Sequence, residues 1–512
     1  MYKVRVLQEI DDRLDAEYYN PAALNTLEKM ETKGTVTTFG SLVNEGYRVV
    51  YHGTDSINGL KNSELLPFLS PTQIDANGAI SFEDADKLPL YYKDRYPKGL
   101  GKAGEILVEV KGNVSKVGIV PLEFPKNLMI SGSLYKATLD PKRADSHYVL
   151  AFLKSKHGQI LKNRLTSNTI INYIAKDALY SIPIIEFGEK AQKYIGDKVR
   201  QAEQLRAWAK RIYLSVQAEI ISELGPCKRE KKLTKRVNPY LLSDRLDQNH
   251  YQNNLLENHK LLMSKDFVKL GDKKEFLNLT DGDHGNPVYG QGPIYLRASE
   301  IKDGLIDKAR QVRLAEDYAS KVGKSCWANS GDVIFSVVGT LGLSAVVEPE
   351  NAGIMSRGIA KVTPQNLPNY FVKAFFKSSY FSDQLVRHSV GTVQRGVYLS
   401  SIEHLMVPVF DDLTMNQIAR EEALADAATT HSNWLIDSAK LLCEALIEGQ
   451  LSEQQLIQAQ QALDDCDNSL DQAILSKLSN EGYAIEGAPP LFSDLDELYR
   501  LLASAAQAET QE

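Results

Sequence analysis

Cysteine is scarce in this sequence: there are only four among 512 residues, and Cys227, Cys326, Cys443 and Cys466 show no CxxC spacing. This usage predicts neither a disulfide framework nor a zinc site, and it fits a reducing cytoplasm. Long apolar runs are missing too. No stretch approaches the 18 apolar residues of a membrane span, and the first dozen residues lack the apolar core of a secretory signal. With 43% hydrophobic and 24% charged residues, we expect a globular cytoplasmic protein without a membrane partner.

Acidic charge gathers at the C-terminal end. Residues 449–512 hold twelve Asp and Glu against two Lys and Arg, a net charge of −10 within a total of −7. The preceding 448 residues therefore carry +3. This asymmetry points to nucleic-acid contact more than the total charge does.

The chain repeats itself. Asp12-Arg13-Leu14-Asp15 returns as Asp244-Arg245-Leu246-Asp247, 232 residues later. Further segments match in the same order: 104–108 with 331–335, 110–113 with 337–340, 119–120 with 346–347, 151–155 with 374–378, and 182–184 with 407–409. The offset drifts only from 232 to 223, as a few loop insertions would produce. The sequence therefore predicts a duplication of about 225 residues followed by a tail.

Each copy has the pattern of a mixed α/β domain. Short β-type runs, including 105–110 and 332–338, alternate with turn residues, and 148–154 and 370–377 have the spacing of helices. The segments around Pro183 and Pro408 should be extended, because proline disfavours helix for itself and its predecessor.

A long helix is expected after each copy, because apolar residues recur in steps of three and four over 189–224 and 414–448. Each helix could lie on its own domain. Alternatively, the two could pair as an antiparallel coiled coil that holds the domains apart. Between the copies, residues 228–236 hold six cations in nine positions, which suits a solvated linker or a phosphate clamp. The predicted boundaries are domain 1 at 1–188, helix 1 at 189–226, linker at 227–243, domain 2 at 244–412, helix 2 at 413–448 and tail at 449–512.

Catalytic motifs are few. The GxGxxG match at 99–104 precedes a strand and not a helix, which inverts the order of a dinucleotide site. Asp94 with Glu109 and Lys111 resembles the D…ExK arrangement of metal-dependent nucleases, although the second copy has Ser336-Val337-Val338 instead. Two similar domains with little chemistry predict a protein that binds a ligand with two similar elements. DNA suits this, since half-sites recur along one face of the duplex.

The order of these segments, found twice over residues 12–448, resembles the specificity subunits of type I restriction–modification systems. In the second copy, the Thr280–Pro287 loop with Asp-Gly-Asp-His leads into 294–301, then into Gly331–Ser336 and Gly339-Thr340. Val407-Pro408-Val409 closes the copy before the long helix. In the first copy Gly46-Tyr47-Arg48 replaces the Asp-Gly-Asp-His type of loop.

This resemblance implies two target recognition domains, each reading half of a split DNA sequence, and paired helices that set the gap and dock two modification subunits. The modification (methyltransferase) subunits would supply S-adenosylmethionine-dependent adenine methylation, and the restriction (translocase) subunits would supply ATP- and Mg-dependent translocation and cleavage. The chain itself would be no enzyme and would hold no cofactor or metal. Two alternatives remain: a nuclease using Asp94, Glu109 and Lys111, and a scaffold that has lost DNA reading.

DNA contacts are expected from polar residues in turns that both copies share, because base edges and phosphates are held by such side chains. In the first copy these are Arg48, Lys111, Asn113, Lys116, Ser131, Ser133, Asn172 and Tyr173. In the second they are His284, Arg297, Thr340, Ser356, Arg357, Thr392, Gln394, Arg395 and Tyr398. Ser131 and Ser356 could instead cap buried turns. The unlike residues at aligned positions, Asn113 with Thr340 and Asn172 with Arg395, would suit different half-sites.

The tail beyond residue 449 shows helical patterns at 452–463 and 493–506. Three roles are open for it: a docking element for a partner, a cover on a basic groove, or a disordered solvating extension. Its acidity speaks against direct DNA contact.

Overall fold

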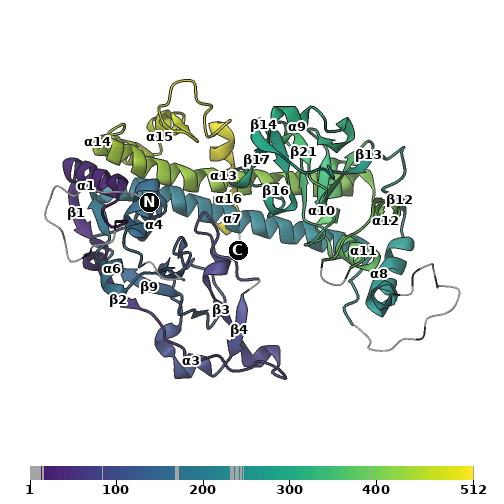
Figure 1. Ribbon diagram of the computed structural model, residues 1–512, viewed down its shortest axis with the longest axis horizontal. Coiled ribbons are helices and arrows are strands. Elements are labelled where there is room, and N and C mark those ends of the chain that lie inside the picture. Colours follow the sequence, from purple (N-terminus) through teal and green to yellow (C-terminus); the bar gives the residue numbers. More distant parts are fainter. Residues whose placement is uncertain are drawn as a thin grey trace. The chain divides into compact units, whose positions relative to one another are not determined.

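The computed structural model describes residues 13, 16–83, 85–167, 172–230, 236, 242, 245, 247–391 and 394–510. They divide into two compact units, unit 1 within residues 1–206 and 431–512 and unit 2 within 207–430. Each unit holds one copy of the repeat and half of each long helix, α7 (Glu189–Leu224) and α13 (Asp412–Glu448) (Figure 1). None of the described helices combines the length and hydropathy needed to cross a membrane.

Unit 1 is built on a four-stranded antiparallel sheet in the order β2-β9-β5-β7. Its central strand β5 is buried on both faces, which explains the unbroken apolar run in the sequence. A second sheet, β4-β3-β8, adds a parallel pair between β3 and β8. The bounds are β2 (Val43–Tyr47), β3 (Leu65–Leu69), β4 (Asp86–Pro89), β5 (Ile106–Glu109), β7 (Val117–Ile119), β8 (Met129–Ile130), β9 (Leu134–Leu139), α1 (Pro21–Lys33), α4 (Ser146–Lys154) and α5 (Lys156–Asn163).

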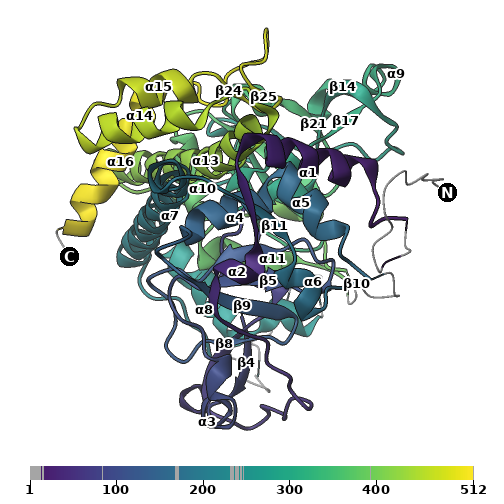
Figure 2. The ribbon, with the colours of Figure 1, turned by 90° about the vertical axis from the view of Figure 1, so that its left-hand side faces the viewer.

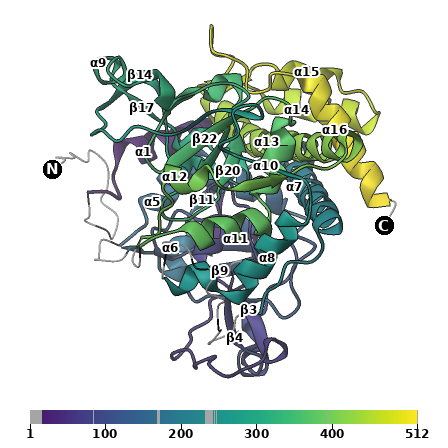
Figure 3. The same cartoon turned by 90° about the vertical axis from the view of Figure 1, so that its right-hand side faces the viewer.

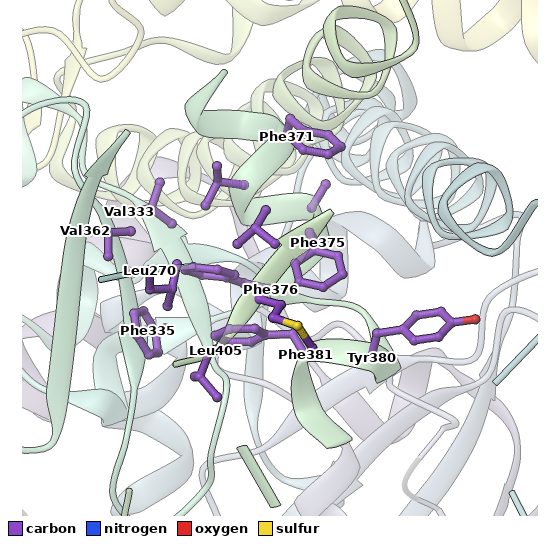
Figure 4. Packing of buried hydrophobic residues seen from close by; sticks show 14 of the residues in the cluster. Leu270, Val333, Phe335, Val362, Phe371, Phe375, Phe376, Tyr380, Phe381 and Leu405 are labelled. Atoms are coloured by element: carbon purple, nitrogen blue, oxygen red, sulfur yellow. The ribbon is translucent and has the colours of Figure 1, made fainter. Parts of the chain in front are cut away.

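Unit 2 repeats this plan with the sheets β13-β22-β19-β20 and β17-β14-β21-β18. Phe335 of β19 packs edge-on against Phe376 and Phe381, which stack on each other with ring centroids 4.0 Å apart (Figure 4). Helix α10 covers β19, β20 and β22 (Figure 3). The bounds are β13 (Phe276–Asp281), β14 (Tyr289–Leu296), β17 (Val312–Leu314), β18 (Trp327–Ala328), β19 (Val333–Ser336), β20 (Ser344–Val346), β21 (Gly353–Met355), β22 (Ile359–Pro364), α8 (Asn253–Met263), α10 (Asn369–Phe376) and α11 (Ser379–His388).

Buried ion pairs confirm the duplication at the level of side chains. In unit 1 the Lys136 ammonium lies 2.8 Å from the carboxylate of Glu105, and both side chains are buried. In unit 2 Lys361 lies 3.0 Å from Asp332, again buried. Each lysine also donates to one backbone carbonyl, of Leu100 or Trp327. In both pairs the acid directly precedes a strand, β5 or β19, and the lysine lies in the neighbouring strand, β9 or β22.

The repeated Arg-Leu-Asp motif has a structural role. Arg13 donates to the carbonyls of Leu165 and Thr166, just beyond the end of α5. Arg245 donates in the same way to His388 and Ser389 at the end of α11. These guanidinium groups bond carbonyls at or just beyond a helix end, so the two arginines fasten the start of each copy to the equivalent place.

The two long helices run antiparallel where they meet inside unit 2, as the fold prediction required. The Tyr213 hydroxyl of α7 donates to Asp426 of α13 at 2.7 Å. Ile220 and Leu224, later in α7, share one core with Met415 and Ile418, earlier in α13. The apolar stripes of both helices are therefore part of the domain core, and the helices are not surface additions.

The tail folds into three helices in unit 1: α14 (Glu453–Asp464), α15 (Ser469–Leu475) and α16 (Leu495–Thr510) (Figure 2). The Asp471 carboxylate, 1% exposed, accepts from the Lys198 ammonium at 2.7 Å and from the hydroxyls of Tyr194 and Tyr499. Because this charge pair is buried and fully bonded, the tail is anchored on α7. The disordered extension is thereby excluded among the three roles open from the sequence.

Candidate nucleic-acid interface

Arg48, Lys111 and Tyr173, three of the predicted residues in unit 1, come together, although 125 positions separate the first from the last in the sequence. Arg48 follows β2, and the short strand β6 (Lys111–Gly112) pairs with β10 (Asn172–Tyr173), which sets Lys111 opposite Tyr173. Of these residues, Arg48 and Tyr173 line a hollow of about 300 Å³, which we call the Arg48 hollow. Its lining residues are Gly46, Tyr47, Arg48, Val50, Val110, Tyr135, Tyr173, Ile174 and Lys176.

The Arg48 side chain is held in place within this hollow. Its Nε donates to the Gly132 carbonyl at 2.6 Å, and its Nη1 donates to the Tyr173 hydroxyl at 3.2 Å. The guanidinium carbon also lies 5.4 Å from the centre of the Tyr173 ring. A guanidinium fixed at two points leaves its remaining N–H groups oriented, which is the arrangement that recognises a planar acceptor pair.

Sequence reasoning missed several residues around the hollow. The Lys98 ammonium lies 5.6 Å from the centre of the Tyr47 ring, and that of Lys176 lies 5.0 Å from the Tyr180 ring. A Cβ atom on Gly46 would come within 2.6 Å of the Tyr135 and Tyr180 hydroxyls, so only glycine fits there. These residues form an alternation of lysine and tyrosine side chains. The alternation is visible only in the folded structure, because the residues are distant in sequence.

Glu109, the central residue of the nuclease alternative, supports its own loop. Its side chain is 4% exposed. The carboxylate accepts the backbone N–H groups of Asn113, Ser115 and Lys116 at 3.2, 3.0 and 3.1 Å. Asp94 lies on the separate short helix α3 (Tyr92–Arg95), and no cluster of three metal-ligating side chains occurs among the described residues. A nuclease function is therefore not favoured, because the Glu109 carboxylate already accepts hydrogen bonds from its own loop.

The loop that Glu109 supports presents side chains outward. Lys111 and Asn113 are exposed and Lys116 is half-buried. In unit 2 the equivalent loop is held by Ser336, whose hydroxyl donates to the Thr340 carbonyl at 2.6 Å and accepts the Leu343 N–H at 2.9 Å. The two copies thus shape the same loop with different side chains.

Ser131 and Ser356 occupy the same turn in the two units. The N–H of Ser131 donates to Leu69 and that of Ser356 to Leu296, both at 2.8 Å. Ser131 is buried and its hydroxyl accepts the Ser133 N–H at 3.2 Å, which is the turn-capping alternative named above. Ser133 and Ser356 are half-buried, whereas Arg357 is exposed.

The hairpin after α11 repeats the one after α5. Val390 and Val338 both bridge to Gly396, as Ser167 and Lys111 bridge to Tyr173 in unit 1. Gln394, Arg395, Tyr398 and Thr340 are all exposed around it. Thr392 lies outside the described residues, as does most of the basic segment between the copies.

The two remaining predicted residues of unit 2 are bonded within their own turns. Arg297 donates through Nε to the buried Glu300 carboxylate at 3.0 Å, and so helps to close a 3-10 turn. His284 is exposed, and its Nε2 lies 2.8 Å from Oδ2 of Asp281. Nearby, the Tyr318 hydroxyl donates to Asp283, and this hydrogen bond raises the pKa of Tyr318 to about 12.

A second hollow in unit 2 was not foreseen from the sequence. It measures about 450 Å³ and lies beside β14, β17 and α9 (Glu316–Ala319). Its lining residues are Gln291, Gly292, Pro293, Arg313, Glu316, Ala319, Ser320 and Trp327. None of them is among the predicted DNA contacts.

Comparison with solved structures finds similar chains, among them the following three. The chain is similar to a type I restriction–modification S subunit from M. genitalium, at 16% identity over 81% of this chain and 95% of that one, with a TM-score of 0.40. It is also similar to the HsdS subunit from Thermoanaerobacter tengcongensis, at 14% identity over 82% and 97% of the two chains, with a TM-score of 0.28. A chain from a structure of type I R-M complex assembly matches at 13% identity over 82% and 98%, again with a TM-score of 0.28. No family model and no curated protein matches the chain.

Proposed function

We propose that this chain is the DNA sequence-recognition subunit of a type I restriction–modification complex. The observation that carries the proposal is a duplicated scaffold with unlike surface residues. The buried pairs Lys136–Glu105 and Lys361–Asp332 are equivalent, whereas the exposed Asn172 and Arg395 at aligned positions differ. A protein that reads two different half-sites needs this combination, because base readout depends on the exposed donors and acceptors alone.

The proposal assigns each unit's recognition domain to one half of a bipartite site. The exposed cations Lys111 and Arg395 suit phosphate or base contact, and the held guanidinium of Arg48 suits base readout. The helices α7 and α13 would dock two modification subunits. Methylation with S-adenosylmethionine would belong to those subunits, and Mg- and ATP-dependent cleavage to restriction subunits, so that this cytoplasmic chain binds DNA without catalysis.

Methylome sequencing tests the proposal directly. The chain is expressed with its modification subunit in a host free of other DNA methylation. A split motif of two short half-sites with a fixed gap should become methylated. Replacing residues 20–185 with another recognition domain should change one half and leave the other half and the gap unaltered.

Two controls separate the alternatives. A stable complex that methylates no motif would contradict sequence reading and favour the scaffold. Metal-dependent DNA cleavage by the isolated chain, lost in Glu109→Ala while the fold persists, would favour the nuclease instead.

A further inference from the structure

The strand register places Arg48 and Asp281 at equivalent positions in the two copies. Lys136 and Lys361 are equivalent through their buried ion pairs. Tyr47 pairs with Lys136 across β2 and β9, and Thr280 pairs with Lys361 across β13 and β22. The next residue along the chain is Arg48 in the first copy and Asp281 in the second. The same point of the scaffold therefore carries opposite charges.

The described residues leave part of the hydrogen-bonding capacity of both side chains unused. Arg48 uses Nε and Nη1, and its Nη2 makes no hydrogen bond to any described residue. Asp281 receives His284 on Oδ2, and its Oδ1 accepts no hydrogen bond from the part of the chain that the structure describes. Both side chains are half-buried at the end of a sheet strand. Each is thus a fixed group with unused donors or acceptors.

The chemistry of the two groups calls for opposite partners on DNA. A guanidinium donates two parallel hydrogen bonds to O6 and N7 of guanine, whereas a carboxylate accepts from the N4 amino group of cytosine. A carboxylate is also repelled by the phosphate backbone, so at an interface with DNA Asp281 is favourable only opposite a base amino group. Tyr173 holds the Arg48 guanidinium from one side, with its ring centre 5.4 Å from the guanidinium carbon and its hydroxyl accepting from Nη1.

We propose that Arg48 reads a guanine in the half-site of the first domain, and that Asp281 reads a cytosine amino group in the half-site of the second. This assignment rests on the function proposed above and names the residues that make the two half-sites differ. Tyr173 and His284 act as positioning residues, because each bonds the reading side chain without needing to touch the base.

The test is the methylome of single variants, made with the same modification subunit. Arg48→Ala should relax one G·C position in one half-site and leave the other half-site and the gap unaltered. Asp281→Asn should shift one position of the other half-site from cytosine towards adenine, because asparagine pairs with adenine N6 and N7. In binding to duplexes carrying the wild-type site, loss of the Arg48 contact should weaken discrimination at that pair by roughly 5- to 150-fold.

A matched control is Arg143→Ala, which removes a guanidinium from the same domain. Arg143 also bonds a backbone carbonyl, that of Ser41 at 2.7 Å, but it does not line the Arg48 hollow. It should leave the motif unchanged. Thermal melting of each variant, together with Arg48→Lys, separates misfolding from lost readout: Arg48→Lys keeps the charge but loses the planar fork, and should relax the same G·C pair.

The failures of the two proposals are distinguishable. A wild-type complex without any methylated motif contradicts the proposed function itself. A wild-type motif that persists unchanged in folded Arg48→Ala and Asp281→Asn variants leaves the function intact and overturns this assignment. If Arg48→Ala weakened methylation evenly at both half-sites, Arg48 would be a phosphate contact, and this result would also overturn the assignment.

Discussion

Replacing Glu109 by alanine should loosen the loop that carries Lys111, Asn113 and Lys116. The carboxylate is 4% exposed and accepts three backbone N–H groups. Gly112 has φ +123, and a Cβ placed there would lie 2.6 Å from the Glu109 Oε1 atom, so the loop is wrapped tightly around this carboxylate. An unpaired buried donor costs about 1–3 kcal/mol. Because two of the three N–H groups belong to the exposed residues Asn113 and Ser115, which water can reach in the variant, we expect a loss of about 1–3 kcal/mol in the stability of unit 1.

Hydrogen exchange of residues 110–117 and denaturant unfolding of the full chain measure this effect. Glu109→Gln keeps one acceptor oxygen, so its loss should be smaller. The matched control is Ser336→Ala, which removes the equivalent support in unit 2 and should loosen 337–343 only. The reasoning is refuted if Glu109→Ala leaves unfolding within about 0.5 kcal/mol of wild type and exchange at 110–117 unchanged.

Three further changes probe the scaffold. Arg245→Ala should lower the stability of unit 2 by about 2 kcal/mol in urea unfolding, because two carbonyls at the end of α11 lose a charged donor. Asp471→Asn leaves the buried Lys198 without its counter-charge and should lower the stability of unit 1 by about 3–5 kcal/mol. We expect faster proteolysis within 449–510. Unchanged digestion would contradict the role of Asp471 in anchoring the tail. Burial lowers the pKa of Lys162 to about 7, so the unfolded chain binds more protons between pH 7 and 10.5, and the stability of unit 1 should rise with pH across that window. Lys162→Met should abolish this rise. The variant should exceed the wild type in stability most at pH 7 or below, by up to roughly 5 kcal/mol. An equal gain in stability at pH 7 and at pH 10 would contradict the prediction.

The duplication and the long helices could be predicted from sequence because both leave periodic signals. Matched segments recur at a nearly constant offset, and an apolar stripe that continues over 36 residues indicates one unbroken helix. The role of the Arg-Leu-Asp motif could not be predicted. Arg13 bonds Leu165 and Thr166, which lie more than 150 positions away. A motif shows that a residue matters to both copies, but only folding shows which partner it meets.

The candidate site was predictable in part from the sequence. Arg48 and Tyr173 were both named from the sequence, and their contact appeared only in the structure. Glu109 has the sequence pattern of a metal ligand, yet its carboxylate accepts backbone N–H groups of its own loop. Arg297 stays a predicted DNA contact, and the structure adds that it donates to Glu300 in its own turn. Local sequence reveals that a residue is charged but not whether its charge faces outward or satisfies nearby backbone groups.

The two copies share buried residues that stabilise the fold and differ in residues that reach the surface. At the buried ion pairs the copies agree: Lys136 and Lys361 each bond one acid and one carbonyl. Such pairs tolerate little change, because removing one partner leaves a buried charge. Where the equivalent side chain reaches the surface, the copies diverge, and at Arg48 and Asp281 even the sign of the charge is reversed. Two domains that bound only the phosphates of DNA would both need a cation at this scaffold position, since the backbone of DNA is uniform. Opposite charges at one scaffold position are instead what two different base edges demand.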